Sequence, residues 1–417
     1  MLFPSISRIL LTRSFKPFVF KNEYSDQLFY QDLENLGLYV HIPFCKTICD
    51  FCPYFKVNYE NDLAKNYLEA ILKEIDIVCL SQKEKKKVTS LYFGGGTPAL
   101  LLSGLLEIIN KLNKYFIITE GIGIELHPDD ICDNTLSAFK AYGINMLSIG
   151  IQSFDGECLN SLGRKDNNFR KKLELAKSYG FSVIDVDLIF GIPKQTKVNL
   201  IKDIELAFEH GATQVSTYPF IDFSFANNKN KPMKESVKKA MLAEIVKYTN
   251  QKNIERTSVW TFSKKGTKKY SSVTRDNFLG FGTSAVTLLR DTFKINTFSI
   301  PGYIKRVNED HLPTSLTLFF TKRQRACYFL FWSCYSMRID AAAFNKTIGM
   351  TLEELFGIEL WLGEKIGLLK KENNGYSLME KGAYFYHKME QAYTTAYIDK
   401  SWNILRTQAF PEKIILK

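Results

Sequence analysis

The sequence has no uncharged apolar run of the ~18 residues that a membrane-spanning helix needs. It also lacks a secreted disulfide framework, because only Cys45, Cys49 and Cys52 of its eight cysteines lie close together. These absences predict a chain without a membrane span, working in a reducing and therefore cytoplasmic compartment. The other cysteines are expected to be small buried hydrophobes rather than ligands, and they are Cys79, Cys132, Cys158, Cys327 and Cys334.

Basic residues interleaved with aromatic residues along one face, which nucleic-acid binding favours, are absent as well. The 417 residues nevertheless carry a formal net charge of +11, which comes mostly from lysine. Such a charge is typical of a solvated lysine-rich surface, and it would equally attract an anionic substrate. We therefore expect no nucleic-acid partner.

The first 20 residues contain Arg8, Arg13 and Lys16 but no acidic residue, a composition that weakly resembles an organellar targeting peptide. Pro4 and Pro17 are expected to interrupt a helix there. We favour an N-terminal arm, residues 1–35, that packs on the main domain.

Between residue 36 and about residue 250, short apolar runs alternate with helical patterns, which predicts repeated βα units and a parallel sheet. The helical patterns lie near residues 62–80, 101–115, 133–142, 167–179 and 198–210. The predicted strands are Leu36–Ile42, Val88–Phe93, Gly123–Leu126, Met146–Ile151, Val183–Ile189 and Gln214–Thr217. Six units are too few for a closed eight-stranded barrel, so we expect an open partial (β/α)6 barrel of the TIM type with functional residues at its strand carboxyl ends.

Two further regions follow the predicted barrel core. Residues 36–255 form the predicted barrel core, and residues 256–314 form a barrel-completing segment with a glycine-rich loop. From residue 315 to residue 417 the pattern is two helices, a short hairpin around Asn373-Asn-Gly and a final helix, which predicts a small helical, winged-helix-like domain. The aromatic run Tyr384 to Tyr397 indicates helix packing, with the cradling of a flat substrate as the alternative.

The first predicted strand is followed by the loop Cys45-Lys-Thr-Ile-Cys49-Asp-Phe-Cys52. Its three thiolates are one fewer than an ordinary cubane iron–sulfur cluster uses, so one iron would remain open to another ligand. Zinc is the alternative, and it would need a fourth ligand such as His41, which lies within the strand.

The cysteine run, with aromatic Phe51 before the third cysteine, resembles the signature of the radical S-adenosylmethionine (SAM) superfamily. Further runs occur in the order and at the intervals of the oxygen-independent coproporphyrinogen III oxidase-like family, across residues 36–290. They are Tyr92-Phe-Gly-Gly-Gly-Thr-Pro98, Glu125-Leu-His-Pro128, Ser148-Ile-Gly-Ile-Gln-Ser-Phe154, Leu162-Gly-Arg164, Asp187-Leu-Ile-Phe-Gly-Ile-Pro193 and Gly280-Phe-Gly-Thr-Ser-Ala285.

The resemblance implies a [4Fe-4S] cluster on Cys45, Cys49 and Cys52, with SAM chelating the open iron and yielding a 5'-deoxyadenosyl radical. The cofactors would be this cluster and one or two SAM molecules. Residues implied near the cluster-bound SAM are Tyr39, Phe51, Gly95, Gly96, Thr97 and Glu125. Residues implied at a second SAM site are Gln152, Arg164 and Asp187.

The branch of the family is open on sequence grounds. The decarboxylase branch carries a further cysteine where Tyr54 stands, and the haem-chaperone branch carries a His-Asn-x-x-Tyr-Trp run where this chain reads Tyr270-Ser-Ser-Val-Thr-Arg-Asp276. A third branch, which uses two SAM molecules to methylate or cyclopropanate, needs no fourth cysteine.

The reaction that the resemblance implies first is oxidative decarboxylation of porphyrinogen propionates. A two-SAM radical methyltransferase and a haem-binding chaperone are the alternatives. The implied partners are a tetrapyrrole or related anionic substrate, held in a basic pocket, and reduced flavodoxin or ferredoxin as the electron donor.

Overall fold

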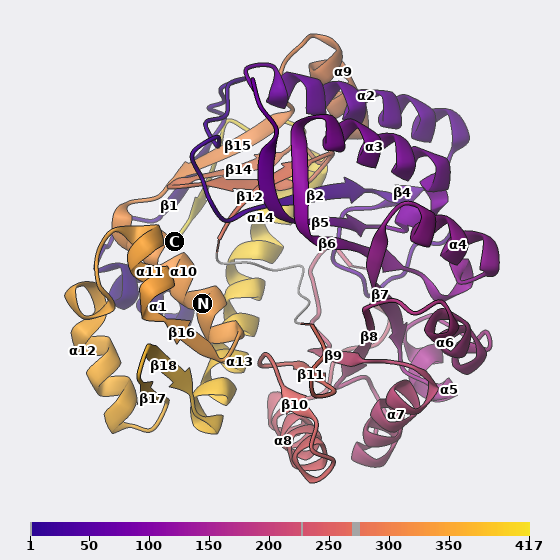
Figure 1. The fold of residues 1–417 in the computed structure, drawn as a ribbon. Helices are drawn as coiled ribbons and strands as arrows, with labels where there is room; N and C mark the ends of the chain where they lie inside the picture. Colours follow the sequence, from indigo (N-terminus) through magenta and orange to yellow (C-terminus); the bar gives the residue numbers. More distant parts are fainter. Residues whose placement is uncertain (1, 227, 269–275) are drawn as a thin grey trace.

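The computed structural model describes residues 2–226, 228–268 and 276–417, and its framework is one 14-stranded sheet. The strand order is β10-β11-β9-β8-β7-β6-β5-β2-β12-β13-β14-β15-β1-β19. Figure 1 shows the helices of the first half of the chain wrapped around the outside of this curved sheet. No helix in the described ranges has the length and apolar character that crossing a bilayer requires.

The six predicted strands are all present, and they form the parallel part of the sheet. They are β2 (Leu36–Ile42), β5 (Lys86–Gly95), β6 (Phe116–Leu126), β7 (Ile144–Gln152), β8 (Val183–Phe190) and β9 (Gln214–Pro219). Their outward-facing side chains, such as Val40, Phe93 and Ile124, are buried in the main apolar core. Their inward-facing side chains include polar and aromatic ones beside the aliphatic Met146 and Val183, so the strand alternation separates a packing face from the face that borders the cavity.

Helices connect the parallel strands and cover their outer face (Figure 1). Side-chain caps fix several helix starts; for example, the Thr196 hydroxyl accepts from the Asn199 N–H at 3.1 Å. The connecting helices are α2 (Asn61–Cys79), α3 (Leu102–Tyr115), α4 (Asp133–Ala141), α5 (Gly156–Ser161), α6 (Phe169–Ser178), α7 (Lys197–His210) and α8 (Glu235–Gln251), with 3-10 turns at Pro98–Leu101 and Pro128–Asp130.

Further strands extend the sheet at both edges. β12 lies parallel to β2, and the strands beyond it are antiparallel, as are β10 and β11 beside β9. Their bounds are β10 (Glu255–Arg256), β11 (Thr261–Ser263), β12 (Asn277–Phe281), β13 (Val286–Leu289), β14 (Thr292–Asn296) and β15 (Thr314–Phe319), with α9 (Ile300–Asn308) before β15. The open barrel that the sequence predicts is thus continued by strands from residues 255–319.

The C-terminal region combines helices with a small sheet of order β16-β18-β17. Its elements are α10 (Lys322–Tyr335), β16 (Arg338–Asp340), α11 (Ala341–Ile348), α12 (Leu352–Lys365), β17 (Leu369–Glu372), β18 (Gly375–Leu378), α13 (Glu380–Tyr393), a π-helical turn (Thr394–Ile398), α14 (Asp399–Thr407) and β19 (Lys413–Leu416). The helices α10 and α11 share an apolar core around Phe329 and Phe344. This arrangement matches the predicted helical region with a short hairpin.

The N-terminal residues form α1 (Leu2–Thr12) and β1 (Phe18–Lys21), which pairs with β19 and β15. The expectation that Pro4 interrupts a helix was wrong. Pro4 lies in the first turn of α1, where its missing N–H has no intrahelical partner to lose. The helix packs against α10 and α13, next to the other chain end (Figure 1).

Candidate active site

The three clustered cysteines lie on the loop that follows β2, beside the short strands β3 (Phe44–Cys45) and β4 (Val57–Asn58). Cys45 is buried, whereas Cys49 and Cys52 are half-buried. The loop is fixed at its base, where the Val57 N–H donates to the Pro43 carbonyl at 2.7 Å. Burial raises the pKa of Cys45 to about 11, so this thiol keeps its proton until a metal displaces it.

The donor set of this loop, three thiolates, fits an iron–sulfur cluster with one open iron. In the described part of the chain, no three His, Cys, Asp or Glu side chains converge on a point that a single ion could occupy. A cluster binds each thiolate through a different iron, so its ligands need not converge. His41 is already engaged, because the Tyr39 hydroxyl donates to its Nδ1 at 2.9 Å and its Nε2 donates to the Phe55 carbonyl at 3.0 Å. Burial lowers the pKa of His41 to about 4, which keeps this ring neutral.

The glycine-rich turn after β5 packs directly against the cysteine loop. A Cβ on Gly96 would lie 2.5 Å from the Phe44 carbonyl oxygen and 3.0 Å from the Cys45 sulfur, so only glycine fits there. The Thr97 hydroxyl lies 3.7 Å from the same sulfur and can donate to it. Gly95 has a φ of +116°, and its N–H donates to the Glu125 carboxylate near the end of β6.

Two acidic residues of the sequence prediction lie inside the barrel, Glu125 on β6 and Asp187 on β8. Glu125 accepts from the Gly95 N–H at 3.0 Å and from the Tyr92 hydroxyl at 3.3 Å. Asp187 accepts from the Ser148 hydroxyl at 2.7 Å. Burial raises the pKa of Glu125 to about 7 and that of Asp187 to about 6, so both carboxyls can respond to a cation placed beside them.

Arg164 connects the cysteine loop to the end of β7. Its guanidinium donates to the Gly150 carbonyl and lies over the Phe51 ring, 5.6 Å from the ring centroid. Gln152 follows at a β-bulge and has a φ of +74°, an unusual backbone conformation for a residue with a side chain. Such backbone positions are held by their surroundings and cluster at binding sites.

Tyr39 completes the set of predicted side chains. Its ring stacks on Tyr92 with the centroids 6.2 Å apart, and both rings lie on the inner face of the sheet. Every residue that the sequence predicts for the cluster and for SAM lines one cavity of about 1530 Å³. The topology therefore brings these residues together, as parallel strands with a common carboxyl edge should.

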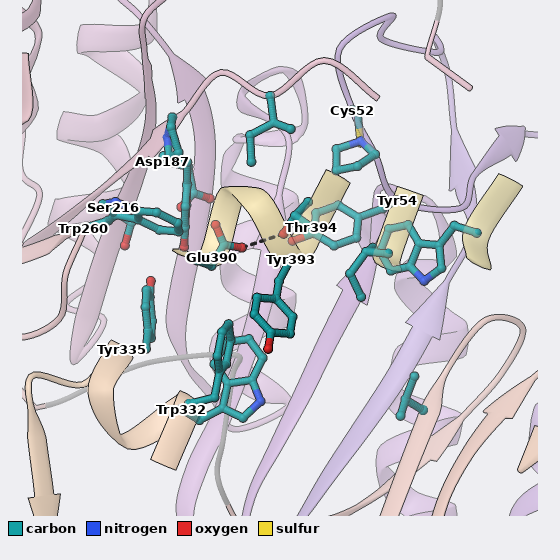
Figure 2. A pocket seen from close by; sticks show the side chains of 18 of the residues that line it. Cys52, Tyr54, Asp187, Ser216, Trp260, Trp332, Tyr335, Glu390, Tyr393 and Thr394 are labelled. Carbon is teal, nitrogen blue, oxygen red and sulfur yellow. Dashed lines mark hydrogen bonds between the residues drawn. The ribbon is translucent and has the colours of Figure 1, made fainter. Parts of the chain in front are cut away.

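The opposite wall of the cavity comes from the C-terminal region, where the sequence prediction favoured helix packing and gave the cradling of a flat substrate only as the alternative. Trp332 and Tyr335 lie on α10, and Glu390 and Tyr393 lie on α13. Figure 2 shows these side chains facing Asp187 and the cysteine loop across the cavity. The aromatic run Tyr384 to Tyr397 thus packs its helix and also supplies cavity wall. No local sequence signal distinguishes the two uses.

The glycine-rich segment after β12 borders the same cavity through Ser284. It is held by Glu74, whose carboxylate accepts from the Gly282 N–H at 2.7 Å, the Tyr303 hydroxyl at 2.6 Å and the Asn296 amide at 2.9 Å. Each oxygen of this buried carboxylate is therefore satisfied. Burial raises the pKa of Glu74 to about 7.

The remaining cysteines lie outside the cluster loop, and all eight are free thiols. Cys79 and Cys158 are buried as expected, and Cys327 and Cys334 are half-buried. The expectation for Cys132 was wrong, because this residue is exposed. It stands at the start of α4, where the Thr135 hydroxyl lies 3.4 Å from its sulfur.

An open parallel barrel with a three-cysteine loop after its first strand is typical of radical SAM proteins, and the model of the Radical SAM superfamily matches residues 39–207. Proteins of this superfamily use a [4Fe-4S] cluster and SAM. Within this superfamily, the chain is similar to the oxygen-independent coproporphyrinogen III oxidase-like (HemN-like) proteins.

The relatives span most of the chain. It is 27% identical over 362 residues to the heme chaperone HemW of Bacillus subtilis, covering 82% of this chain and 95% of that protein. It is 26% identical over 323 residues to the oxygen-independent coproporphyrinogen III oxidase of Escherichia coli K12, covering 70% of each. The solved structure of coproporphyrinogen III oxidase (HemN) from Escherichia coli has a TM-score of 0.76 at 22% identity, covering 93% of this chain and 98% of that one. This structural similarity, at 22% identity, shows the fold alone.

Proposed function

We propose that this chain is a radical SAM enzyme that oxidatively decarboxylates the propionate groups of a porphyrinogen, as the names of several relatives indicate for those proteins. The observation that carries the proposal is the single cavity of about 1530 Å³. It extends from the three cysteines, past the strand-end carboxyls, to the aromatic wall of α10 and α13. The residues proposed for the cofactors and the space proposed for a tetrapyrrole therefore lie in one cavity.

In this proposal Cys45, Cys49 and Cys52 hold the cluster. The cluster and SAM, once bound and reduced by flavodoxin or ferredoxin, supply the one-electron chemistry that removes a hydrogen atom from a substrate carbon. The residues proposed to hold the cluster-bound SAM are Tyr39, Phe51, Gly95, Gly96, Thr97 and Glu125. Those proposed for a second SAM are Gln152, Arg164 and Asp187.

The physical state of the two acidic residues supports these roles. Because burial holds the pKa of Glu125 near 7, a neighbouring cationic group such as the SAM sulfonium would favour the ionised form of this carboxyl. The pKa of Asp187, near 6, allows the same response. Their ion pairs would form inside a cavity that the aromatic wall shields from water, where such pairs are stronger than at a surface.

The substrate itself would meet two kinds of lining. The basic residues that line the cavity are Arg8, Lys46, Lys56, Arg164 and Lys165, and they suit the propionate carboxylates. The aromatic side chains of α10 and α13 suit the ring system. The basic pocket that the sequence suggested is therefore only one part of the lining.

An anaerobic turnover assay tests the proposal. The reconstituted, dithionite-reduced protein is incubated with SAM and coproporphyrinogen III, and 5'-deoxyadenosine, S-adenosylhomocysteine and the porphyrin products are separated by chromatography. We expect 5'-deoxyadenosine together with a decarboxylated product. Cys49→Ser should abolish both, whereas Cys132→Ser, which changes a thiol outside the cavity, should leave both intact. An intact cluster that yields neither product would refute the enzyme assignment, and S-adenosylhomocysteine in their place would indicate methyl transfer.

Haem binding without turnover is the second candidate, and the observation that favours it is the similarity to HemW over 95% of that protein. Residues 270–275, where the haem-chaperone branch carries its His-Asn-x-x-Tyr-Trp run, lie outside the described residues. A Soret titration distinguishes the two candidates. Stoichiometric, tight haem binding by a protein that forms no 5'-deoxyadenosine would favour the chaperone.

A further inference from the structure

Asp185 is a buried carboxyl in the cavity with one oxygen left without a partner. It precedes Asp187 by two residues on β8, so both side chains point to the inner face of the sheet. Its Oδ2 accepts from the Gln214 amide and the Ser216 hydroxyl, each at 2.8 Å. Its Oδ1 is buried and makes no hydrogen bond, although Asp185 is only 4% exposed and lines the cavity.

Glu390 presents a second such oxygen from the opposite wall. Its Oε1 accepts from the Thr394 hydroxyl at 2.8 Å, at the point where α13 changes into the π-helical turn. Its Oε2 is buried and makes no hydrogen bond. Figure 2 shows the carboxyl directed into the cavity. π-helical turns of this kind occur frequently at functional sites.

The two carboxyls line the same cavity, Asp185 from β8 and Glu390 from α13. Tyr335 lines it too, and burial, with Asp185 and Glu390 adding to it, raises the pKa of its hydroxyl. Its ring packs edge-on against Trp260 at 5.8 Å and against Trp332 at 6.0 Å. The cavity that the two carboxyls line therefore also has flat aromatic surfaces.

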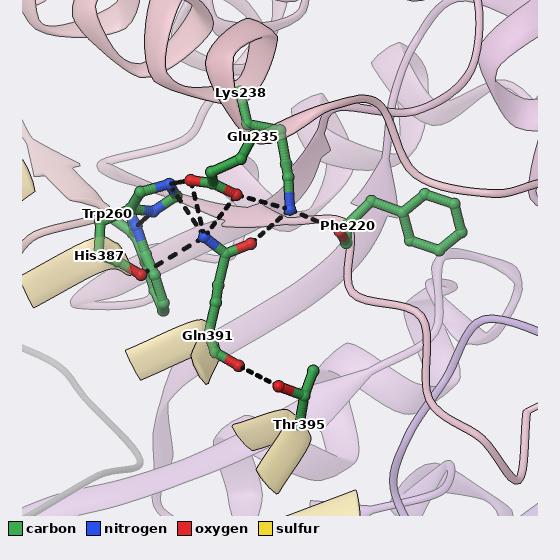
Figure 3. Close-up of polar contacts among 7 residues, drawn as sticks. All are labelled: Phe220, Glu235, Lys238, Trp260, His387, Gln391 and Thr395. Atoms are coloured by element: carbon green, nitrogen blue, oxygen red, sulfur yellow. Dashed lines mark hydrogen bonds and ion pairs between the residues drawn. The ribbon is translucent and has the colours of Figure 1, made fainter. Parts of the chain in front are cut away.

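The nearest lysine cannot fill the gap at Glu390. Lys238 feels the Glu390 charge, but its ammonium lies 3.2 Å from Glu235 and also donates to Gln391 and to the Phe220 carbonyl (Figure 3). An ammonium has only three N–H donors, and these contacts use them. A buried acceptor without a donor costs about 1–3 kcal/mol. Burial raises the pKa of both carboxyls, so each unpartnered oxygen can take up a proton or accept from a ligand that supplies an N–H donor.

We propose that Asp185 and Glu390 recognise the inner N–H groups of a metal-free tetrapyrrole and so select it against a ring whose nitrogens hold a metal. The proposal rests on the proposed function and names the substrate group that this part of the cavity contacts. The aromatic surfaces would hold the ring while the two carboxyls accept from its N–H groups. Like-charge repulsion would direct the propionates away from Asp185 and Glu390, toward the basic lining.

Two stable probes isolate this recognition. Coproporphyrin III retains inner N–H groups, and its nickel(II) complex has the same carboxylates but a square-planar metal in place of those protons. Each is titrated anaerobically into the reconstituted protein without SAM or reductant, and binding is followed by quenching of tryptophan fluorescence. We expect the metal-free ring to bind at least about tenfold more tightly, which corresponds to a hydrogen bond to a charged group.

Asp185→Asn and Glu390→Gln test the two residues at nearly constant shape. In each variant the remaining oxygen can keep the existing hydrogen bonds, so the new NH2 group takes the unpartnered position and opposes the ring N–H. Each change should reduce the preference for the metal-free ring about tenfold. Asp203→Asn is the matched control, because this buried carboxyl lies outside the cavity and its amide can still accept from the Phe154 N–H and donate to the Ser153 hydroxyl.

The outcomes separate this inference from the proposed function. Equal affinity for both probes, no binding of either, or variants that keep the wild-type preference would each overturn the recognition by Asp185 and Glu390, even if turnover is observed. A preserved preference in a protein that forms no 5'-deoxyadenosine with coproporphyrinogen III would instead overturn the enzyme assignment. Melting curves of the variants confirm that each is folded before titration.

Discussion

The hydrogen bond between Trp260 and His387 links the floor of the cavity to the helix that covers it, and its loss should measurably weaken the fold. The Trp260 N–H donates to His387 Nδ1 at 3.0 Å (Figure 3). Because an indole can only donate, Nδ1 must carry the lone pair, and Nε2 then donates to Glu235 at 2.9 Å. Although burial alone would raise the pKa of Glu235, His387 and Lys238 lower it to about 2, so this acceptor is ionised.

The change His387→Phe keeps a ring of similar size in a site with no exposed surface and removes both bonds. Leaving the buried indole N–H unpaired costs about 1–3 kcal/mol. Losing the bond to ionised Glu235 costs about 1.5 kcal/mol, at the low end for a charged acceptor because Lys238 and Gln391 still contact that carboxylate. The free energy of unfolding should therefore fall by about 3 kcal/mol.

A double-mutant cycle with Trp260→Phe isolates the shared bond. Once the indole N–H is gone, His387→Phe should cost only about 1.5 kcal/mol, which gives a coupling energy of about 1.5 kcal/mol. The measurement is urea denaturation of the metal-free protein, followed by far-ultraviolet circular dichroism. His210→Phe, which disrupts only the contact with exposed Glu174, should cost less than about 1 kcal/mol. Costs of the two single changes that add to within about 0.5 kcal/mol in the double variant would refute the reasoning.

Three further changes have defined outcomes. Glu125→Gln should weaken SAM binding about tenfold in equilibrium dialysis, because it removes a charge beside Gly95. The iron content after reconstitution should stay unchanged, because Glu125 is not a cluster ligand, and a loss of iron would contradict this expectation. Gly280→Ala should lower the free energy of unfolding by more than about 2 kcal/mol in urea, because the added Cβ would lie 2.2 Å from the Val286 carbonyl oxygen. The folded-state pKa of Glu74, about 7, exceeds the unfolded value of about 4.3, so stability from this group is complete below about pH 4 and is lost as pH rises through 7. Glu74→Gln should flatten that slope in urea denaturation measured across this range, and an unchanged slope would exclude Glu74 as its source.

The parallel strands could be predicted because each combines an apolar run with a polar or glycine-rich end. The start of β6 could not. The sequence indicates a strand from Gly123, whereas β6 begins at Phe116. Gly121, with a φ of +138°, lies in a register shift against β5 and resembles a turn when read locally. Pairing with β5 from Phe116 onward keeps this irregular stretch in the sheet, and pairing with β7 begins only at Ile122.

The cofactor side of the site could be predicted for a topological reason. Parallel strands share a carboxyl edge, so residues near the ends of neighbouring strands, such as Glu125 on β6, Gln152 on β7 and Asp187 on β8, line the same cavity. Asp185 carried a signal that was available, since the alternation Asp185-Val-Asp187 places both carboxyls on one face. Tyr335 and Glu390 carried none. They reach the cavity because α10 and α13 pack against the open barrel, and helical periodicity alone does not reveal which partner a helix face meets.

The distribution of charge in the cavity also constrains how a tetra-anionic substrate would enter. The net charge of +11 suggests a basic pocket, yet the barrel interior and the wall opposite it contribute Glu125, Asp185, Asp187 and Glu390. Burial raises the pKa of each, so approaching propionates would push these groups toward their neutral forms, whereas N–H donors or a SAM cation would ionise them. These four carboxyls thus favour hydrogen-bond donors or cations over the propionate carboxylates of the substrate. The ring is consequently expected to enter with its propionates toward the lysine and arginine lining and its nitrogens toward α13.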